Sequence, residues 1–78
     1  MYRIYLEYHN DAENKHRFYQ LWVVPSLFED WTLVKEWGRV GSPGTVRKEW
    51  FSTETEAMTA QALWKDKKMK KGYLDRGG

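Results

Sequence analysis

Three clusters of turn-forming residues divide the first 51 residues into four segments rich in aromatic and β-branched side chains. The clusters are residues 10–15, 25–30 and 41–44, and two of them contain the prolines of the chain. Gly, Pro, Asn and Asp favour turns, and Pro also removes a hydrogen-bond donor from a sheet. The pattern therefore predicts four short strands joined by antiparallel hairpins, with no long helix before residue 52.

The strand segments are expected at residues 2–9, 16–24, 31–40 and 45–51. The first alternates apolar and polar side chains with a period of two, as a half-buried strand does. In the loop that begins at Pro25, we expect Leu27 and Phe28 to fold back as a small apolar anchor.

Helix signals follow the fourth segment. Thr53 and Glu56 have the spacing of a capping box, and Gly72 is placed as a C-terminal stop, so a helix is expected at about residues 54–71. Ala57, Ala60 and Trp64 share one stripe of this helix. The predicted fold is α+β, an antiparallel four-stranded sheet with one long C-terminal helix packed across one face.

The length of 78 residues indicates one domain, residues 1–78, with a core at about 2–74 and a frayed tail at 75–78. Five Trp, five Tyr and three Phe can fill a small core and leave aromatics for a surface. The absence of Cys excludes disulfides and fits a reducing, cytoplasmic setting. Since no apolar run is long enough to span a bilayer, no membrane association is expected.

Charge is distributed unevenly along the chain. Residues 1–44 carry five Lys/Arg and six Asp/Glu, whereas residues 45–78 carry eight Lys/Arg and five Asp/Glu. Five lysines cluster near the expected helix end and are opposed only by Asp66. The cluster suits either a phosphate-facing patch or a solvated helix end that complements the helix dipole. Its members are Lys65, Lys67, Lys68, Lys70 and Lys71.

Catalytic motifs are missing from the sequence. His9 and His16 flank the first loop, but no third metal ligand has a clear spacing, so both are read as neutral surface residues. No nucleophile motif, phosphate-binding glycine motif or paired acid and base can be recognised. No enzymatic activity, metal or cofactor is therefore expected.

What remains is a binding surface centred on Trp37, Gly38 and Arg39. Trp offers a face for stacking, Gly permits close approach, and Arg supplies a planar donor fork for phosphate or carboxylate. The alternative reading of this triplet is a strand end with a core Trp and a solvated Arg. Further candidates for stacking and phosphate contacts are aromatic or basic. They are Tyr73, Arg17, Lys68, Lys71, Arg47 and Lys48.

These residues, in this order, resemble the WGR domain family over about residues 2–74. The resemblance is carried by the run from Trp37 to Gly41, Gly44, Phe51-Ser52, Lys70-Lys71-Gly72-Tyr73 and the Arg17-Phe18-Tyr19 segment. In poly(ADP-ribose) polymerases the similar domain binds DNA at strand breaks.

The resemblance implies roles for individual residues. Trp37 would pack on the sugar backbone, Arg39 would contact DNA and a neighbouring domain, and Tyr73 would approach the phosphate at the break. His16 occupies a position where the polymerases often have Asn, and its imidazole can also donate to phosphate. Polymerase activity is not expected, because the chain ends at Gly78 without a catalytic domain.

Two functions from different classes follow. The first is a nucleic-acid-binding module, with duplex DNA ends or nicks as the expected partner, although the residues do not distinguish DNA from RNA. The second is a protein-interaction module that uses the same surface, with Arg39 meeting a carboxylate.

Overall fold

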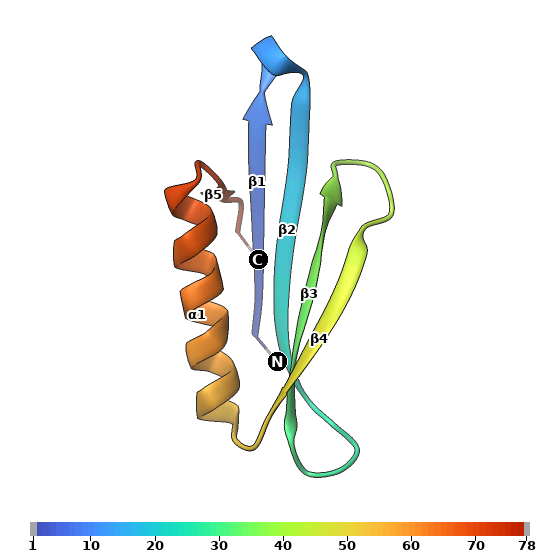
Figure 1. Cartoon of the computed structure of the whole chain (residues 1–78), viewed down its shortest axis with the longest axis vertical. Coiled ribbons are helices and arrows are strands. Elements are labelled where there is room, and N and C mark those ends of the chain that lie inside the picture. Colours follow the sequence, from blue (N-terminus) through green and yellow to red (C-terminus); the bar gives the residue numbers. More distant parts are fainter. Residues whose placement is uncertain (1, 78) are drawn as a thin grey trace.

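The computed structural model describes residues 2–77, which form one antiparallel sheet and one long helix (Figure 1). The sheet has five strands in the spatial order β4-β3-β2-β1-β5. The α+β class and the positions of the first four strands are confirmed, whereas the predicted four-stranded count is wrong. The elements are β1 (Tyr2–Asn10), a short 3-10 helix η1 (Asp11–Glu13), β2 (Lys15–Pro25), β3 (Trp31–Arg39), β4 (Thr45–Phe51), α1 (Glu54–Lys70) and β5 (Leu74–Asp75).

The fifth strand corrects the expectation of a frayed tail. Leu74–Asp75 pairs with the free edge of β1, and the backbone N–H of Arg76 donates to the carbonyl oxygen of Tyr5 at 3.0 Å. Lys65 on the helix adds an ion pair to the Asp75 carboxylate at 3.1 Å. Because main-chain pairing with an edge strand depends little on side-chain pattern, a two-residue strand gives no sequence signal.

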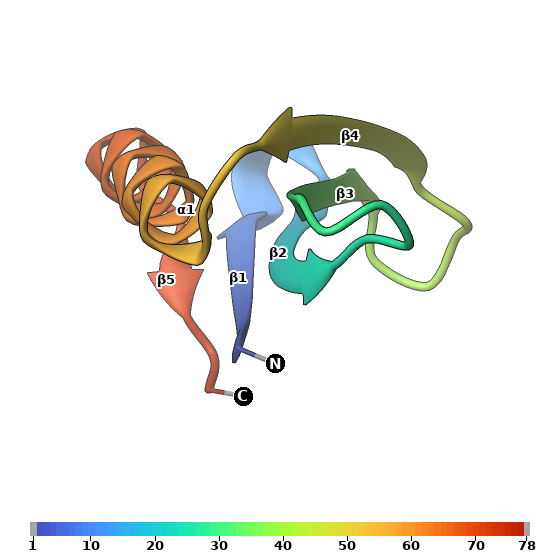
Figure 2. The same ribbon diagram turned by 90° about the horizontal axis from the view of Figure 1, so that it is seen from below.

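The helix is capped as its sequence predicts. The hydroxyl oxygen of Thr53 accepts a hydrogen bond from the Glu56 N–H at 3.1 Å. The last helical residue is Lys70, and Gly72 follows with a φ of +104°, a conformation that glycine adopts without strain. The helix follows β4 and leads to β5, the two edge strands of the sheet, and it runs lengthwise beside the strands (Figure 1). Figure 2 shows it along one face, away from the β2–β3 and β3–β4 connections.

The core lies between the helix and the sheet. The buried Gln61 side chain donates to the Leu21 carbonyl oxygen at 3.1 Å and ties α1 to β2. Ala57 is fully buried, which lets the helix approach the strands closely, and Trp64 packs at the edge of the same cluster. The buried apolar residues of the cluster are Ile4, Leu6, Tyr19, Leu21, Val23, Leu33 and Ala57.

A charged side chain is also buried under the helix. Lys35 on β3 is only 5% exposed, and its ammonium forms an ion pair with the Glu49 carboxylate on β4. The same Nζ lies 4.3 Å from the centre of the Trp64 ring. The carboxylate and the ring face together compensate the loss of water around this cation.

The loop between β2 and β3 contradicts one expectation. Leu27 and Phe28 are 95% and 87% exposed, so they do not form an apolar anchor. The loop is closed by polar groups instead, because the Ser26 N–H donates to the Asp30 carbonyl oxygen at 2.9 Å and its hydroxyl donates to the Asp30 carboxylate. These bonds close the turn through polar groups.

Candidate nucleic-acid interface

A surface hollow of about 460 Å³ lies where β2 and β3 meet the C-terminal end of α1. Seven of the ten candidate residues line it, and an eighth, Lys71, lines an adjoining hollow of about 160 Å³ together with Tyr8, Lys15, Arg17 and Tyr73. The lining of the larger hollow is Asn14, Lys15, His16, Arg17, Tyr19, Trp37, Gly38, Arg39, Lys68 and Tyr73.

Strand register brings the central residues together. Arg17 pairs with Arg39 across β2 and β3, and Tyr19 pairs with Trp37 two positions further along. Because side chains alternate along a strand, all four project to the face that carries the helix. The run of residues after α1 then places Tyr73 beside them, 6.4 Å from Tyr19 between ring centres.

The floor of the hollow is a stack of aromatic rings around Tyr19. The Trp37 ring lies 5.5 Å from the Tyr19 ring at an interplanar angle of 10°, and Trp64 lies on Tyr19 at 6.2 Å and 16°. Burial raises the pKa of the Tyr19 phenol to about 12, so the hydroxyl keeps its proton at neutral pH. Trp37 is only partly buried and keeps part of its side chain at the surface of the hollow.

Lys68 brings a cation to this aromatic cluster. Its Nζ lies 4.7 Å from the centre of the Tyr19 ring and 5.8 Å from that of Tyr73. Burial, and then the nearby charges of Lys71 and Lys67, lower the pKa of the Lys68 ammonium. A lysine held by ring faces, with like charges around it, gains from an anion placed in the hollow.

Four cations at the rim have no carboxylate partner among the described residues. Arg17 and Arg39 are exposed and face each other in the register, an arrangement of like charges that destabilises a strand pair. Among the residues 2–77, no carboxylate forms an ion pair with Arg17, Arg39, Lys68 or Lys71. Lys15 differs, because it is paired with Glu13 at 3.2 Å. The rim is thus a cluster of four cations whose charges are not neutralised by the described part of the chain.

Gly38 serves packing on the other face of the sheet. A Cβ atom there would lie 3.2 Å from the Gly44 Cα and 3.5 Å from the Phe18 ring, where the β3–β4 connection folds over β2. Gly44 is more crowded, with the Trp37 carbonyl oxygen and the Phe18 ring both at 2.8 Å from the position of a Cβ. The two glycines therefore let this connection settle against the sheet, and with it they position Trp37 and Arg39.

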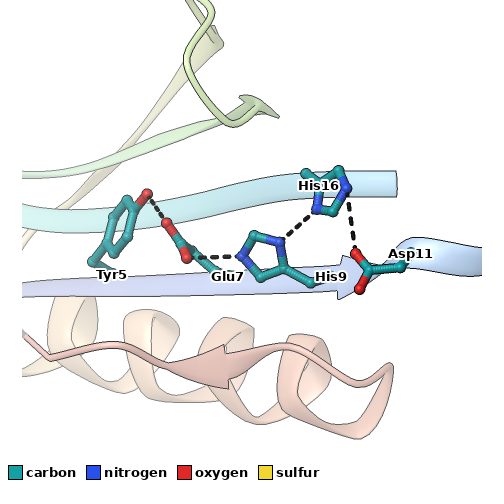
Figure 3. A network of polar contacts seen from close by, with 5 residues as sticks. All are labelled: Tyr5, Glu7, His9, Asp11 and His16. Atoms are coloured by element: carbon teal, nitrogen blue, oxygen red, sulfur yellow. Dashed lines mark hydrogen bonds and ion pairs between the residues drawn. The ribbon is translucent and has the colours of Figure 1, made fainter. Parts of the chain in front are cut away.

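The His16 side chain is engaged elsewhere. It pairs with His9 on the face of the sheet opposite the helix and reaches toward Asp11 (Figure 3). Arg47 and Lys48 on β4 line neither hollow. The lining residues that the sequence reasoning missed are Tyr8, Asn14, Lys15 and Tyr19. Of these, Tyr19 could have been found, because it alternates with Arg17 on one strand.

Fold and site together describe a small α+β domain, a sheet and helix with a cationic, aromatic hollow at one end. A family model for the WGR domain matches residues 2–78, and the chain belongs to the WGR domain family. It is 33% identical over 75 residues to an uncharacterized protein, y4dW, of Sinorhizobium fredii; the match covers 96% of this chain and 37% of that protein. No solved structure matches it.

Two further findings describe the chain outside the hollow. No helix in the described part of the chain is long and apolar enough to cross a membrane. Among residues 2–77, no group of three or more His, Cys, Asp or Glu side chains is arranged to hold a metal ion.

Proposed function

We propose that this domain binds the nucleic-acid backbone in the hollow between β2, β3 and the end of α1, with DNA duplex ends or nicks as the preferred ligand. The observation that carries the proposal is the cluster of four unneutralised cations around partly exposed Trp37 and Tyr73 rings. Phosphates neutralise such cations, and aromatic faces stack on sugars or bases that a break leaves open. The domain acts as a binding module in a reducing, cytoplasmic setting.

The preference for ends follows from the shape of the site. The partly exposed Trp37 and Tyr73 rings and three of the four cations line one hollow of about 460 Å³, and Lys71 lies in the hollow that adjoins it. An intact duplex offers phosphates to the rim but keeps its bases stacked, whereas an end or a nick exposes sugar and base surface to Trp37. Arg17 and Arg39 together can hold adjacent phosphate oxygens through their planar donor forks.

Fluorescence anisotropy with labelled blunt, nicked and intact circular duplexes, and with a matched RNA duplex, tests the proposal. The blunt and nicked DNA should bind more tightly than the intact DNA at low salt. Trp37→Ala and Arg39→Ala should each weaken binding while leaving the circular dichroism spectrum unchanged. Absence of binding to every nucleic acid at low salt would refute the proposed function.

A protein partner is the second candidate, because two guanidinium groups side by side also bind carboxylates bidentately. Exposed Leu27, Phe28 and Trp50 offer further contact area away from the hollow. A pull-down repeated after nuclease treatment separates the two functions. A protein retained by the wild type and lost with Arg39→Ala, in a domain that binds no nucleic acid, would favour this candidate.

A further inference from the structure

The tip of the β1–β2 hairpin holds two histidines that face each other on the side of the sheet opposite the helix (Figure 3). His9 and His16 are direct partners in the strand register, and their ring centres lie 5.0 Å apart. The two Nδ1 atoms approach to 2.7 Å. Both side chains are about one-third exposed, at 37% and 32%, so solvent and small ions reach them.

The outer nitrogen of each ring faces a carboxylate. His9 Nε2 lies 2.9 Å from Glu7 Oε1, and the Tyr5 hydroxyl donates to the other Glu7 oxygen at 2.6 Å. The Glu7 carboxylate can therefore accept a hydrogen bond from His9 Nε2–H while the Tyr5 hydroxyl holds its other oxygen in place. His16 Nε2 lies 3.6 Å from Asp11 Oδ1.

These contacts determine whether each Nδ1 atom donates or accepts in the hydrogen bond between the two rings. In the tautomer of His9 that carries its proton on Nε2, toward Glu7, the Nδ1 atom presents a lone pair, and His16 Nδ1–H can donate to it. Two lone pairs would face each other if His16 carried its proton on Nε2 instead, toward Asp11. A cation between the two Nδ1 atoms would stabilise that state.

We propose that His9 and His16 bind a divalent transition-metal ion of the zinc, nickel and copper group through their Nδ1 atoms. At metal–nitrogen distances of about 2.0–2.1 Å and a tetrahedral angle, the two nitrogens stand about 3.3 Å apart. The two Nδ1 atoms therefore have to separate by only about 0.6 Å from their present 2.7 Å, and the rings have to turn so that both lone pairs converge on the ion. The proton that His16 carries on Nδ1 moves to its own Nε2, which lies 3.6 Å from Asp11 Oδ1, so both imidazoles stay neutral when the ion binds.

The carboxylates beside His9 and His16 distinguish this pair from an ordinary pair of surface histidines without supporting groups. Histidines that bind metals usually donate their other N–H to a carboxylate or carbonyl, which orients the ring and makes it a stronger ligand. Glu7 is already placed to accept this hydrogen bond from His9, and the Tyr5 hydroxyl holds Glu7 in position. Asp11 is placed to do the same for His16.

The chain supplies two ligands, and water or an external anion fills the remaining positions. This agrees with the finding that the described residues contain no group of three or more metal-binding side chains. Imidazole ligands favour zinc, nickel and copper over magnesium and calcium. His16 borders the hollow, but its side chain meets His9 on the opposite face of the sheet, so the inference does not rest on the proposed function.

Isothermal titration calorimetry with ZnCl2, and with MgCl2 as the negative control, tests the site. Wild type should bind one Zn²⁺, and His9→Gln and His16→Gln should each abolish the heat while keeping the circular dichroism spectrum. Glu7→Gln should weaken binding by about tenfold, the lower end of the effect of such supporting carboxylates. Glu13→Gln is the matched control on the same hairpin, since Glu13 pairs with Lys15 and faces neither histidine; it should bind as wild type does.

Three results would overturn the inference. The first is the absence of Zn²⁺ binding by the wild-type domain at millimolar ZnCl2, and the second is binding by the His9→Gln and His16→Gln variants equal to that of wild type. The third is equal affinity of Glu7→Gln and wild type, which would reduce the pair to adventitious surface histidines. A rise in melting temperature with ZnCl2 in wild type alone would support it, because a ligand that binds only the native state stabilises that state.

Discussion

The number of unneutralised cations around the hollow sets how steeply DNA binding depends on salt. Arg17, Arg39, Lys68 and Lys71 line the two adjoining hollows without an ion pair from the described residues. Each phosphate that a cation neutralises contributes about −0.9 to the slope of log K against log salt concentration. Four contacts give a slope of about −3.6, so affinity should fall roughly 150-fold between 50 and 200 mM NaCl.

Removing one cation should make this slope less steep by the contribution of one phosphate contact, about 0.9. Arg39→Gln is expected to give a slope of about −2.7, a fall of roughly 40-fold over the same salt range. Lys48→Gln is the matched control, because Lys48 on β4 pairs with Val34 on β3 and lines neither hollow. Its slope should equal that of wild type. Anisotropy titrations of one blunt duplex at four or five NaCl concentrations supply all three slopes.

A wild-type slope close to zero would refute the electrostatic reasoning, even if DNA binds. The same holds if Lys48→Gln lowers the slope and Arg39→Gln does not, because the phosphates would then lie on the opposite face of the sheet.

Three further predictions concern stability. Burial raises the pKa of Tyr19 from 10.0 to about 12, so the folded state favours the neutral phenol. Its contribution to the free energy of unfolding, about 2–3 kcal/mol, is complete below pH 10 and is lost as pH rises toward 12. Tyr19→Phe should therefore flatten the alkaline decline in stability seen in urea titrations. Glu49→Gln should cost about 1–3 kcal/mol in urea denaturation because it leaves the Lys35 ammonium buried without its carboxylate; an unchanged midpoint would show that the Trp64 ring suffices. Gly44→Ala should lower the unfolding free energy by about 1–3 kcal/mol, since the added Cβ meets a backbone oxygen at 2.8 Å, and a melting temperature equal to that of wild type would argue against this crowding.

The local parts of the fold could be predicted because their signals are local. Proline, glycine and the alternation of side chains place the first four strands, and the Thr53 cap and Gly72 place the helix ends. The fifth strand could not be predicted, because the pairing of Leu74–Asp75 with β1 joins residues that are far apart in sequence and depends on main-chain groups. The exposure of Phe28 was missed for a related reason, since hydrogen bonds within the loop decide its shape.

The candidate site was predictable where strand alternation and motif order agree. Trp37 and Arg39 are two residues apart and share a face, as the sequence suggests. The same alternation separates His16 from Arg17, so these two predicted neighbours point to opposite faces. The central place of Tyr19 depends on the register between β2 and β3 and on the position of the helix, neither of which the sequence specifies.

Trp indole signals in a proton–nitrogen NMR spectrum give the most direct test of where nucleic acid binds. Trp37 lines the hollow, whereas Trp22 and Trp50 lie on the opposite face of the sheet. Titration with a short blunt DNA duplex should shift the Trp37 indole resonance strongly and leave those of Trp22 and Trp50 in place. Shifts of Trp22 and Trp50 with an unmoved Trp37 would contradict the assignment of the hollow as the binding surface.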